Sequence, residues 1–390
     1  MARLHSEFDQ SPWLDNLRRR WITDGDLRRW VDRGIRGLTS NPSIFQKAIS
    51  QSSDYDEQFA DLVRSGTATE SAYWHLVTDD IGGALDALAP VHDSSDGADG
   101  FVSVEVDPGL ARDTDATLAA ARRLSESIDR PNLMVKIPGT EEGLPAVRAM
   151  IGEGRSVNVT LIFSVERYRQ VAEAYLAGLE DLLADRAGLE DLLADRSGAA
   201  GPAPADAVLG TVSSVASFFV SRIDTEVDRR LDAVVESSGT AAGTAAAALR
   251  GRAAVANGRA AYAAWGELFS GPRWERLAAH GARPQRPLWA STSTKNPAYP
   301  DTLYVDQLIG PGTVNTMPDD TLAAFADHGT LERTLDADPA GAFDVLRRLG
   351  DVGVDMAEVA DVLEAQGVSS FVKSYEELLE SLRTKAAELA

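Results

Sequence analysis

The chain has 390 residues, with 38 Lys and Arg against 60 Asp and Glu, a formal net charge of −22 and no cysteine. The lack of thiols excludes disulfide scaffolds, thiolate metal sites and cysteine nucleophiles. The acidic balance, spread along the chain, argues against a nucleic-acid partner, which needs a basic stripe. Hydrophobic residues make up 44% of the chain, enough to bury a large core. The length fits two or three domains, or one long α/β barrel.

No segment indicates export or membrane insertion. The first residues, MARLHSEFDQ, lack the apolar stretch of a signal peptide. No uninterrupted apolar run approaches the ~18 residues of a membrane span, and the longest candidate, Ala207–Val220, is interrupted by Gly, Ser and Thr. We therefore expect a soluble, cytoplasmic protein with no membrane partner.

Eight short apolar or alternating stretches are separated by longer segments, most of them of helical period. Among the latter are Leu110–Ile128, Leu144–Glu153 and Val165–Leu183. This pattern predicts βα units around a parallel sheet, and eight of them make a (β/α)8 TIM barrel. The predicted strands are Ser11–Asp15, Gly34–Asn41, Gly100–Asp107, Asn132–Pro138, Ser156–Phe163, Gly210–Val220, Pro287–Ser293 and Gly312–Met317.

The remaining segment, residues 319–390, has no strand pattern and ends in the amphipathic run SSFVKSYEELLESLRTKAAEL. We expect a helical C-terminal extension that packs on the barrel, within a single domain spanning residues 1–390.

A tandem repeat interrupts the otherwise regular pattern. AGLEDLLADR occurs at Ala177–Arg186 and again at Ala187–Arg196. Ten residues rotate a helix by roughly 1000°, about 80° short of whole turns, so the second copy cannot extend the apolar face of the first. Two copies are also too few for a solenoid. We expect a duplication on the surface; a partner-binding helix is the alternative.

Polar residues within the predicted strands mark the candidate site. Alternate side chains of a barrel strand face the helices and the interior, and barrel enzymes build their sites at the C-terminal ends of the strands. In Ser156–Phe163, alternation places Leu161 on the apolar face, away from the site. The polar residues selected in this way are Ser103, Glu105, Lys136, Asn158, Thr160, Ser291 and Ser293, with Asp15 and Asn41 at strand ends.

Lys136 is the most informative of these residues. A lysine inside an apolar strand is costly to bury charged, and desolvation favours the free amine that attacks carbonyl groups. The alternative is a lysine that reaches a strand end or pairs with Glu105.

Glu105 and Asp15 provide two carboxylates for proton transfer. Each also has a structural alternative, a solvated strand end or a helix N-cap. Asn41 could be only the turn residue that Asn-Pro suggests, and Asn158 and Thr160 could only hydrogen-bond the backbone.

Other chemistries find little support. The chain contains neither GxxxxGK[ST] nor GxGxxG, the usual nucleotide cradles. Its five histidines are scattered outside the predicted strands, so neither a histidine metal site nor a Ser-His-Asp relay is indicated.

Four stretches resemble the transaldolase family, in its longer bacterial branch. They are GLTSNPSIFQKAI, LMVKIPGTEEGLPAVRAMIGEGRSVNVTLIFS, ASFFVSRIDTEVD and RPLWASTSTKNPAYPDTLYVDQLIGPGTVNTMP. The likeness extends from Trp13 to the terminal helices. It implies a class I aldolase barrel in which Lys136 forms a Schiff base, without metal or cofactor.

The resemblance also assigns the other site residues. Asp15, Glu105 and Thr160 take the family's proton-handling positions, and Asn41, Asn158 and Ser217 those that hold the substrate. Phe219 and Ser291 also match, and Arg222 resembles the phosphate-binding arginine. Where shorter members have Ser-x-Arg on the seventh strand, this chain reads STSTKN, which makes Lys295 the second cation. A lysine lacks the bidentate fork of arginine.

The implied reaction transfers a dihydroxyacetone unit between sugar phosphates in the pentose phosphate pathway. The donor is sedoheptulose 7-phosphate or fructose 6-phosphate, the acceptor is glyceraldehyde 3-phosphate or erythrose 4-phosphate, and the enzyme is a monomer or homodimer. The alternatives are an aldolase of the same superfamily, a catalytically silent sugar-phosphate-binding barrel and a metal-dependent lyase. The aldolases carry Gln in place of Glu105 and Tyr in place of Phe219, so the sequence favours transfer.

Overall fold

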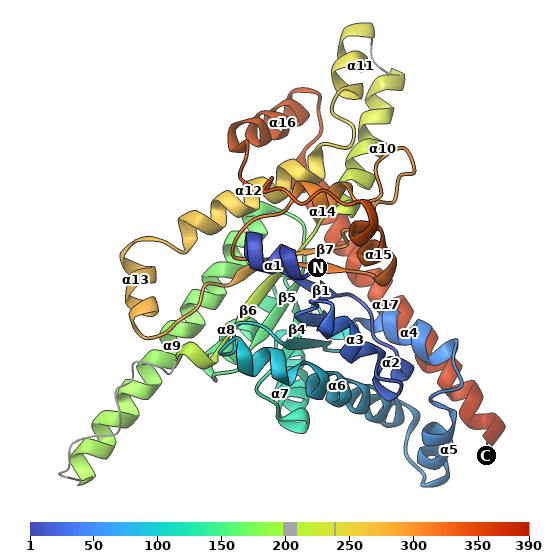
Figure 1. Cartoon of the computed structure of the whole chain (residues 1–390), viewed down its shortest axis with the longest axis vertical. Coiled ribbons are helices and arrows are strands. Elements are labelled where there is room, and N and C mark those ends of the chain that lie inside the picture. The colour runs from blue at the N-terminus through green and yellow to red at the C-terminus, as the bar shows by residue number, and fades with distance from the viewer. Residues whose placement is uncertain (198–208, 238, 390) are drawn as a thin grey trace.

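The computed structural model describes residues 1–197, 209–237 and 239–389. Eight parallel strands form a closed barrel in the order β1 to β8, with helices around it (Figure 1). All eight predicted strands, and the TIM-barrel fold, are confirmed. The strands are β1 (Gln10–Leu14), β2 (Gly37–Thr39), β3 (Phe101–Glu105), β4 (Leu133–Pro138), β5 (Val157–Ile162), β6 (Ser214–Phe219), β7 (Arg286–Ala290) and β8 (Thr313–Met317).

Helices follow the strands and add further layers. Those up to β5 are α1 (Ala2–Phe8), α2 (Arg19–Thr23), α3 (Asp26–Asp32), α4 (Pro42–Ser50), α5 (Asp56–Arg64), α6 (Thr69–Ser94), the 3₁₀ helix η1 (Pro108–Leu110), α7 (Thr114–Ile128) and α8 (Gly143–Gly152). Those after it are α9 (Val165–Ser197), α10 (Ser221–Ser237), α11 (Thr240–Ala247), α12 (Ala253–Leu268), α13 (Gly271–Ala279), α14 (Leu303–Gln307), α15 (Asp319–His328), α16 (Pro339–Asp351) and α17 (Met356–Leu389).

Several predicted bounds were too wide because local turn chemistry ends the elements sooner. β2 covers only part of Gly34–Asn41, since Gly34 has a left-handed φ of 104° and the Asn41 side chain caps α4 by accepting from Ile44 N. Likewise α7 starts at Thr114, not Leu110, because the Asp113 side chain caps it by accepting from Ala116 N.

One helix is longer than predicted. α9 continues past Leu183 to Ser197 and contains both copies of the repeat in one helix. Its far end projects away from the barrel in Figure 1. The side chains of the second copy lie outside the described residues.

The alternation in β5 breaks after Thr160. The pairing of β5 with β6 shifts register between Val159 and Ile162, and Leu161 has a φ of 60°. Such a bulge inserts an extra residue and redirects the side chains beyond it. The prediction that Leu161 shares the face of Val159 is therefore wrong: Leu161 approaches Gly367 of α17, at the C-terminal end of the barrel.

A buried carboxylate ties the N-terminal end of the barrel together. Asp99, which is 1% exposed, accepts hydrogen bonds from Ser11 and from Trp13 Nε1 at 3.1 Å. It also forms ion pairs with Arg36 at 2.7 Å and with Arg286 at 3.0 Å. Burial alone would raise the pKa of Asp99, but Arg286 with the Ser11 and Arg36 hydrogen bonds outweighs it and holds the pKa below its usual range. Asp99 thus links β1 to the residues before β2 and β3 and to the first residue of β7.

Among the described residues after β8, the structure contains three helices, α15, α16 and α17, which are joined by loops, and no strand. α17 contacts α4, α5, α6, α10, η1 and β5. Ser374 lies within 2.7 Å of Ser43 on α4, and the rings of Tyr375 and Tyr73 have centroids 5.4 Å apart. None of the described helices combines the length and apolar character needed to cross a membrane.

Candidate active site

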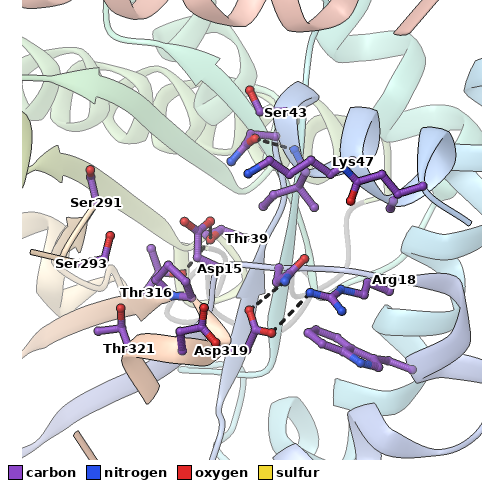
Figure 2. Close-up of a pocket in the computed structure, with 18 of the residues that line it drawn as sticks. Asp15, Arg18, Thr39, Ser43, Lys47, Ser291, Ser293, Thr316, Asp319 and Thr321 are labelled. Atoms are coloured by element: carbon purple, nitrogen blue, oxygen red, sulfur yellow. Dashed lines mark hydrogen bonds and ion pairs between the residues drawn. The ribbon is translucent and has the colours of Figure 1, made fainter. Parts of the chain in front are cut away.

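A cavity of about 1050 Å³ opens at the C-terminal end of the barrel. In Figure 2, Asp15 and Thr39 lie at its centre, Ser291 and Ser293 on one side, and Lys47 beside Ser43 on α4. Eight of the predicted site residues line it, namely Asp15, Asn41, Lys136, Ser217, Phe219, Arg222, Ser291 and Lys295. The other three, Glu105, Asn158 and Thr160, are buried in the neighbouring strands β3 and β5.

The deepest charged group in the cavity is Lys136. The register of β3 with β4 sets Glu105 beside Lys136, and Lys136 Nζ lies 3.1 Å from Glu105 Oε2, with both side chains at most 5% exposed. Nζ also donates to the Ser40 carbonyl at 3.3 Å. The ion pair with Glu105, which was the structural alternative for Lys136, is therefore present, and Lys136 also lines the cavity.

The two carboxylates near Lys136, Glu105 and Asp15, both have a raised pKa. Burial raises the pKa of Glu105, against the attraction of Lys136. Burial likewise raises the pKa of Asp15, and Lys136 and a hydrogen bond from Thr39 act in the opposite direction. A carboxylate with a raised pKa accepts a proton from an amine or hydroxyl more readily than one in water.

Asp15 is no helix cap, although an N-cap was its structural alternative. It follows β1 directly, and Thr39 at the end of β2 donates to its Oδ1 at 2.8 Å. The Thr39 hydroxyl is in turn 2.7 Å from that of Thr316 on β8. Two neighbouring strands therefore hold the Asp15 carboxylate at the cavity.

Two buried polar atoms near Lys136 have no hydrogen-bond partner among the described residues. They are the Thr160 hydroxyl and Glu105 Oε1. Buried polar groups are nearly always paired in folded proteins. These two are therefore available to a substrate hydroxyl or a water molecule.

Asn158 is held by other side chains in the barrel interior. Its amide nitrogen donates to Ser103 Oγ at 3.0 Å, and its Oδ1 accepts from Ser217 Oγ at 2.7 Å. The strand register places it beside Lys136. It thus orients Ser217, which lines the cavity. The alternative of a backbone hydrogen bond does not describe this contact.

Asn41 is the predicted turn residue and also a residue of the cavity lining. Its Oδ1 accepts from Ile44 N at 3.0 Å and caps α4, as the Asn-Pro sequence suggested. The same residue lines the cavity, so the cap fixes its side chain there.

Aromatic rings surround the Arg222 guanidinium. Its Cζ lies 5.2 Å from the centroid of Phe219 and 6.0 Å from that of Phe371, and Phe163 packs 5.2 Å from Phe219. Burial lowers the pKa of Arg222, against the attraction of Asp15 and Glu105. No carboxylate of the described residues forms an ion pair with it.

The loop after β7 contributes Ser291 and Lys295. Ser291 has a φ of 56°, and its hydroxyl lies 3.0 Å from that of Ser221 at the start of α10. Lys295 Nζ donates to Ser293 Oγ at 2.5 Å, and burial, followed by Arg222, lowers the pKa of Lys295.

Among the lining residues that the sequence reasoning missed are Thr39, Lys47, Thr316 and Phe371. Thr39 and Thr316 lie in predicted strands, and their position beside strand-end polar residues could have indicated them. No local signal indicates Phe371, which reaches the site from the C-terminal helix.

The cavity is more positive than the molecule around it. Its lining holds seven cationic side chains and five carboxylates, a net of +2 against −22 for the chain. The two sets are Arg18, Arg19, Arg20, Lys47, Lys136, Arg222 and Lys295, and Asp15, Asp26, Asp54, Asp319 and Asp320. Within the described part of the chain, no group of three or more His, Asp or Glu has a metal-binding arrangement.

This geometry agrees with the comparisons with known proteins. A family model described as Transaldolase/Fructose-6-phosphate aldolase matches residues 12–382. The chain belongs to this family. Its relatives include a protein named transaldolase from Thermobifida fusca (strain YX), 50% identical over 96% of this chain and 95% of its own. Family members with the same name from Parafrankia sp. (strain EAN1pec) and Saccharopolyspora erythraea are 49% and 47% identical, each over 97% of this chain and over 96% and 95% of their own.

Proposed function

We propose that this protein is a transaldolase that moves a dihydroxyacetone unit from a ketose phosphate to an aldose phosphate through a Schiff base on Lys136. The observation that carries the proposal is the buried Lys136–Glu105 pair, 3.1 Å apart, in a cavity that Asp15 also lines. Donors are sedoheptulose 7-phosphate or fructose 6-phosphate, and acceptors glyceraldehyde 3-phosphate or erythrose 4-phosphate, as in the non-oxidative pentose phosphate pathway.

The first step joins the substrate to the enzyme. Lys136 passes a proton to Glu105, and its free amine attacks the C2 ketone to form a carbinolamine. Glu105 returns that proton to the C2 hydroxyl, which leaves as water while the C=N bond forms. The unpaired Glu105 Oε1 and Thr160 hydroxyl suit a shared water molecule that relays these protons.

The second step breaks the carbon skeleton. Asp15 removes the C4 hydroxyl proton, the C3–C4 bonding electrons move into the iminium, and the aldose phosphate leaves. The enamine then attacks the aldehyde of the acceptor, and Asp15 returns its proton to the new hydroxyl. Hydrolysis of the iminium releases the product and restores Lys136.

The remaining residues bind the substrate. Asn41, Ser217 and Asn158 hold the three-carbon unit, with Phe219 as an apolar wall. Arg222, with Ser291 and Lys295, binds the phosphate. Arg222 has no carboxylate partner among the described residues, so its charge is free for a dianion.

A fructose-6-phosphate aldolase is the second candidate, because the family includes both activities. Glu105 and Phe219 favour transfer, since the aldolases carry Gln and Tyr in those positions. A silent sugar-phosphate-binding barrel would not need Lys136, Glu105 and Asp15 together. A metal-dependent lyase would lose activity with a chelator.

The test measures both reactions with one preparation. Fructose 6-phosphate is supplied with and without erythrose 4-phosphate, with a chelator in parallel. We expect sedoheptulose 7-phosphate as the main product and little free dihydroxyacetone. Release of dihydroxyacetone at the same rate without acceptor would indicate the aldolase, and loss of activity with the chelator a metal-dependent enzyme.

We further propose that residues 1–390 form one domain, in which residues 319–390 extend the barrel. The proposal is supported by the contacts that α17 makes with helices from the first quarter of the chain. Its oligomeric state, monomer or homodimer, can be measured by sedimentation.

A further inference from the structure

Helix α17 places an aromatic ring against the charged groups of the cavity. Phe371 is 4% exposed and lines the cavity. Its ring centroid lies 5.8 Å from Lys136 Nζ and 6.0 Å from Arg222 Cζ. These are cation–π distances, and the ring is supplied by a segment more than 200 residues from Lys136.

The backbone around Phe371 fixes this position. One turn earlier, Gly367 lies against Leu161, and a Cβ on Gly367 would come within 2.8 Å of Leu161 Cδ2 and 3.6 Å of Arg222 Nη1. The left-handed φ of Leu161 at the β5 bulge turns this side chain toward α17. A glycine lets the helix lie this close without displacing the Leu161 side chain, so the bulge and Gly367 together bring the ring to the site.

Contacts C-terminal to Phe371 hold α17 against α4 and α5. Ser374 meets Ser43 on α4 at 2.7 Å, and Lys385 pairs with Asp56 of α5. The ring therefore forms a wall of the cavity and not a mobile side chain at its rim.

An apolar wall beside Lys136 matters for the fate of the enamine, and this reasoning rests on the proposed function. In transfer, the enamine carbon forms a bond to the acceptor aldehyde. In the competing reaction, that carbon takes a proton, water adds at C2, and the C–N bond breaks to give dihydroxyacetone and the lysine amine. Both routes end with water adding at C2, so they differ at the enamine carbon, which in the competing reaction takes a proton from water or another donor that reaches it.

We propose that Phe371 is a specificity-determining residue that keeps water from the enamine carbon of the Lys136 adduct and so favours transfer over release of dihydroxyacetone. An aromatic ring excludes water by its volume and stabilises a neighbouring cation by its face. It therefore shields the enamine carbon from water, and it carries no hydroxyl that could itself protonate the enamine.

The experiment compares Phe371→Ala and Phe371→Leu with Leu378→Ala, a control that weakens the packing of α17 away from the cavity. The readout is the ratio of dihydroxyacetone released to sedoheptulose 7-phosphate formed, from fructose 6-phosphate and erythrose 4-phosphate. We expect Phe371→Ala to raise this ratio by about tenfold, since water gains access. Phe371→Leu, which keeps an apolar side chain, should change it by less than about threefold.

A second readout follows the adduct itself. Enzyme loaded with fructose 6-phosphate is diluted without acceptor, and the adduct remaining on Lys136 is trapped with borohydride over time. The adduct should decay about tenfold faster in Phe371→Ala than in the wild type. In Leu378→Ala both the ratio and the decay should match the wild type.

The proposal is overturned if Phe371→Ala lowers transfer and release in parallel at an unchanged ratio, or if Leu378→Ala raises the ratio equally. Should Phe371→Ala fail to fold, Phe371→Gln takes its place, and an unchanged ratio there overturns the proposal as well. A wild-type enzyme that forms no sedoheptulose 7-phosphate would instead refute the proposed function, which separates the two failures.

Discussion

Each end of the barrel buries a carboxylate beside basic side chains, but the pKa of that carboxylate is lowered at one end and raised at the other. At the N-terminal end, Asp99 is saturated by Ser11, Trp13, Arg36 and Arg286, and its pKa is lowered. At the C-terminal end, burial raises the pKa of Glu105, and Glu105 Oε1 has no hydrogen-bond partner among the described residues.

This difference separates stability from function. A carboxylate with all of its acceptors paired stabilises the fold and has no capacity left for a ligand. A carboxylate with a raised pKa destabilises the folded protein when it is ionised. Because one of its oxygens is free, it can take up a proton and release it again. With both in one barrel, the paired carboxylate at the N-terminal end offsets the cost of burying an ionisable one at the C-terminal end.

The largest effect is expected at the C-terminal end, from Lys136→Met. Loss of the amine removes the covalent intermediate, so kcat should fall by roughly 10⁴-fold or more, the scale seen when a covalent nucleophile is lost. A steady-state transfer assay and circular dichroism check this. A variant that keeps more than about a hundredth of the wild-type kcat would show that Lys136 is not the nucleophile.

At the N-terminal end, Asp99→Asn should affect stability and not catalysis. It leaves Arg36 and Arg286 without their buried carboxylate, and breaking such a pair costs about 3 kcal/mol of unfolding free energy. Urea denaturation measures this loss, and the kcat of the folded enzyme should stay unchanged. A normal urea midpoint together with a loss of kcat would instead show that Asp99 acts in catalysis and not in stability.

Asp15→Asn tests the sign of the pH dependence. Because the folded pKa of Asp15 is raised, the folded state loses stability as the pH rises from the ordinary carboxylate pKa of about 4 to that raised pKa, and the loss stays constant above it. The variant should therefore be as stable as the wild type or more stable at pH ~7, with the difference vanishing near the ordinary carboxylate pKa of about 4. Its kcat should fall about 10²- to 10⁴-fold.

Asp99→Asn is the matched variant for this test, and we expect the pH dependence of its stability to be opposite. The stability from its lowered pKa is present above the unfolded pKa and is lost as the pH falls. Destabilisation by Asp99→Asn should thus shrink toward low pH. If the urea midpoints of Asp15→Asn and Asp99→Asn, each compared with the wild type, change with pH in the same direction, the contrast between the two ends is wrong.

A smaller effect is expected from Lys295→Ala at the rim of the cavity. Removal of one phosphate-binding cation should raise KM for fructose 6-phosphate roughly fivefold to tenfold, at nearly constant kcat. Added salt should raise KM in the wild type, because the cavity lining is positive, and less so in the variant. Lys373→Ala, on the exposed side of α17, is the matched control, and an equal KM change there would contradict the assignment.

The smallest effect is expected from deletion of Ala187–Arg196. The second copy of the repeat lies at the end of α9, which projects away from the barrel in Figure 1. We expect kcat/KM to stay nearly unchanged. A loss greater than about tenfold, or 1.4 kcal/mol, would show that this segment contributes to the site.

The sequence predicts the barrel and the charged centre of the site for the same reason. Period-two alternation marks the strands, and Lys136 and Glu105 stand out as ionisable residues on an otherwise apolar strand face. Asp15 and Asn41 are marked by their positions at strand ends. Here local sequence and tertiary position agree.

The remaining features depend on contacts between distant segments. The bulge that reverses Leu161 is a register shift between two strands, so alternation within one strand cannot reveal it. Phe371 lies on one face of an amphipathic helix, and its role depends on where that helix crosses the barrel. The departure of Lys295 from the expected arginine is visible in the sequence, but its position at the rim depends on the fold of the loop after β7.

The central claim is that Lys136 carries the substrate covalently, and borohydride reduction in the presence of fructose 6-phosphate tests it most directly. Peptide mass spectrometry should find a reduced three-carbon adduct on Lys136 and none in the Lys136→Met variant. An active enzyme that yields no adduct, or that carries it on Lys47 or Lys295, would contradict the account.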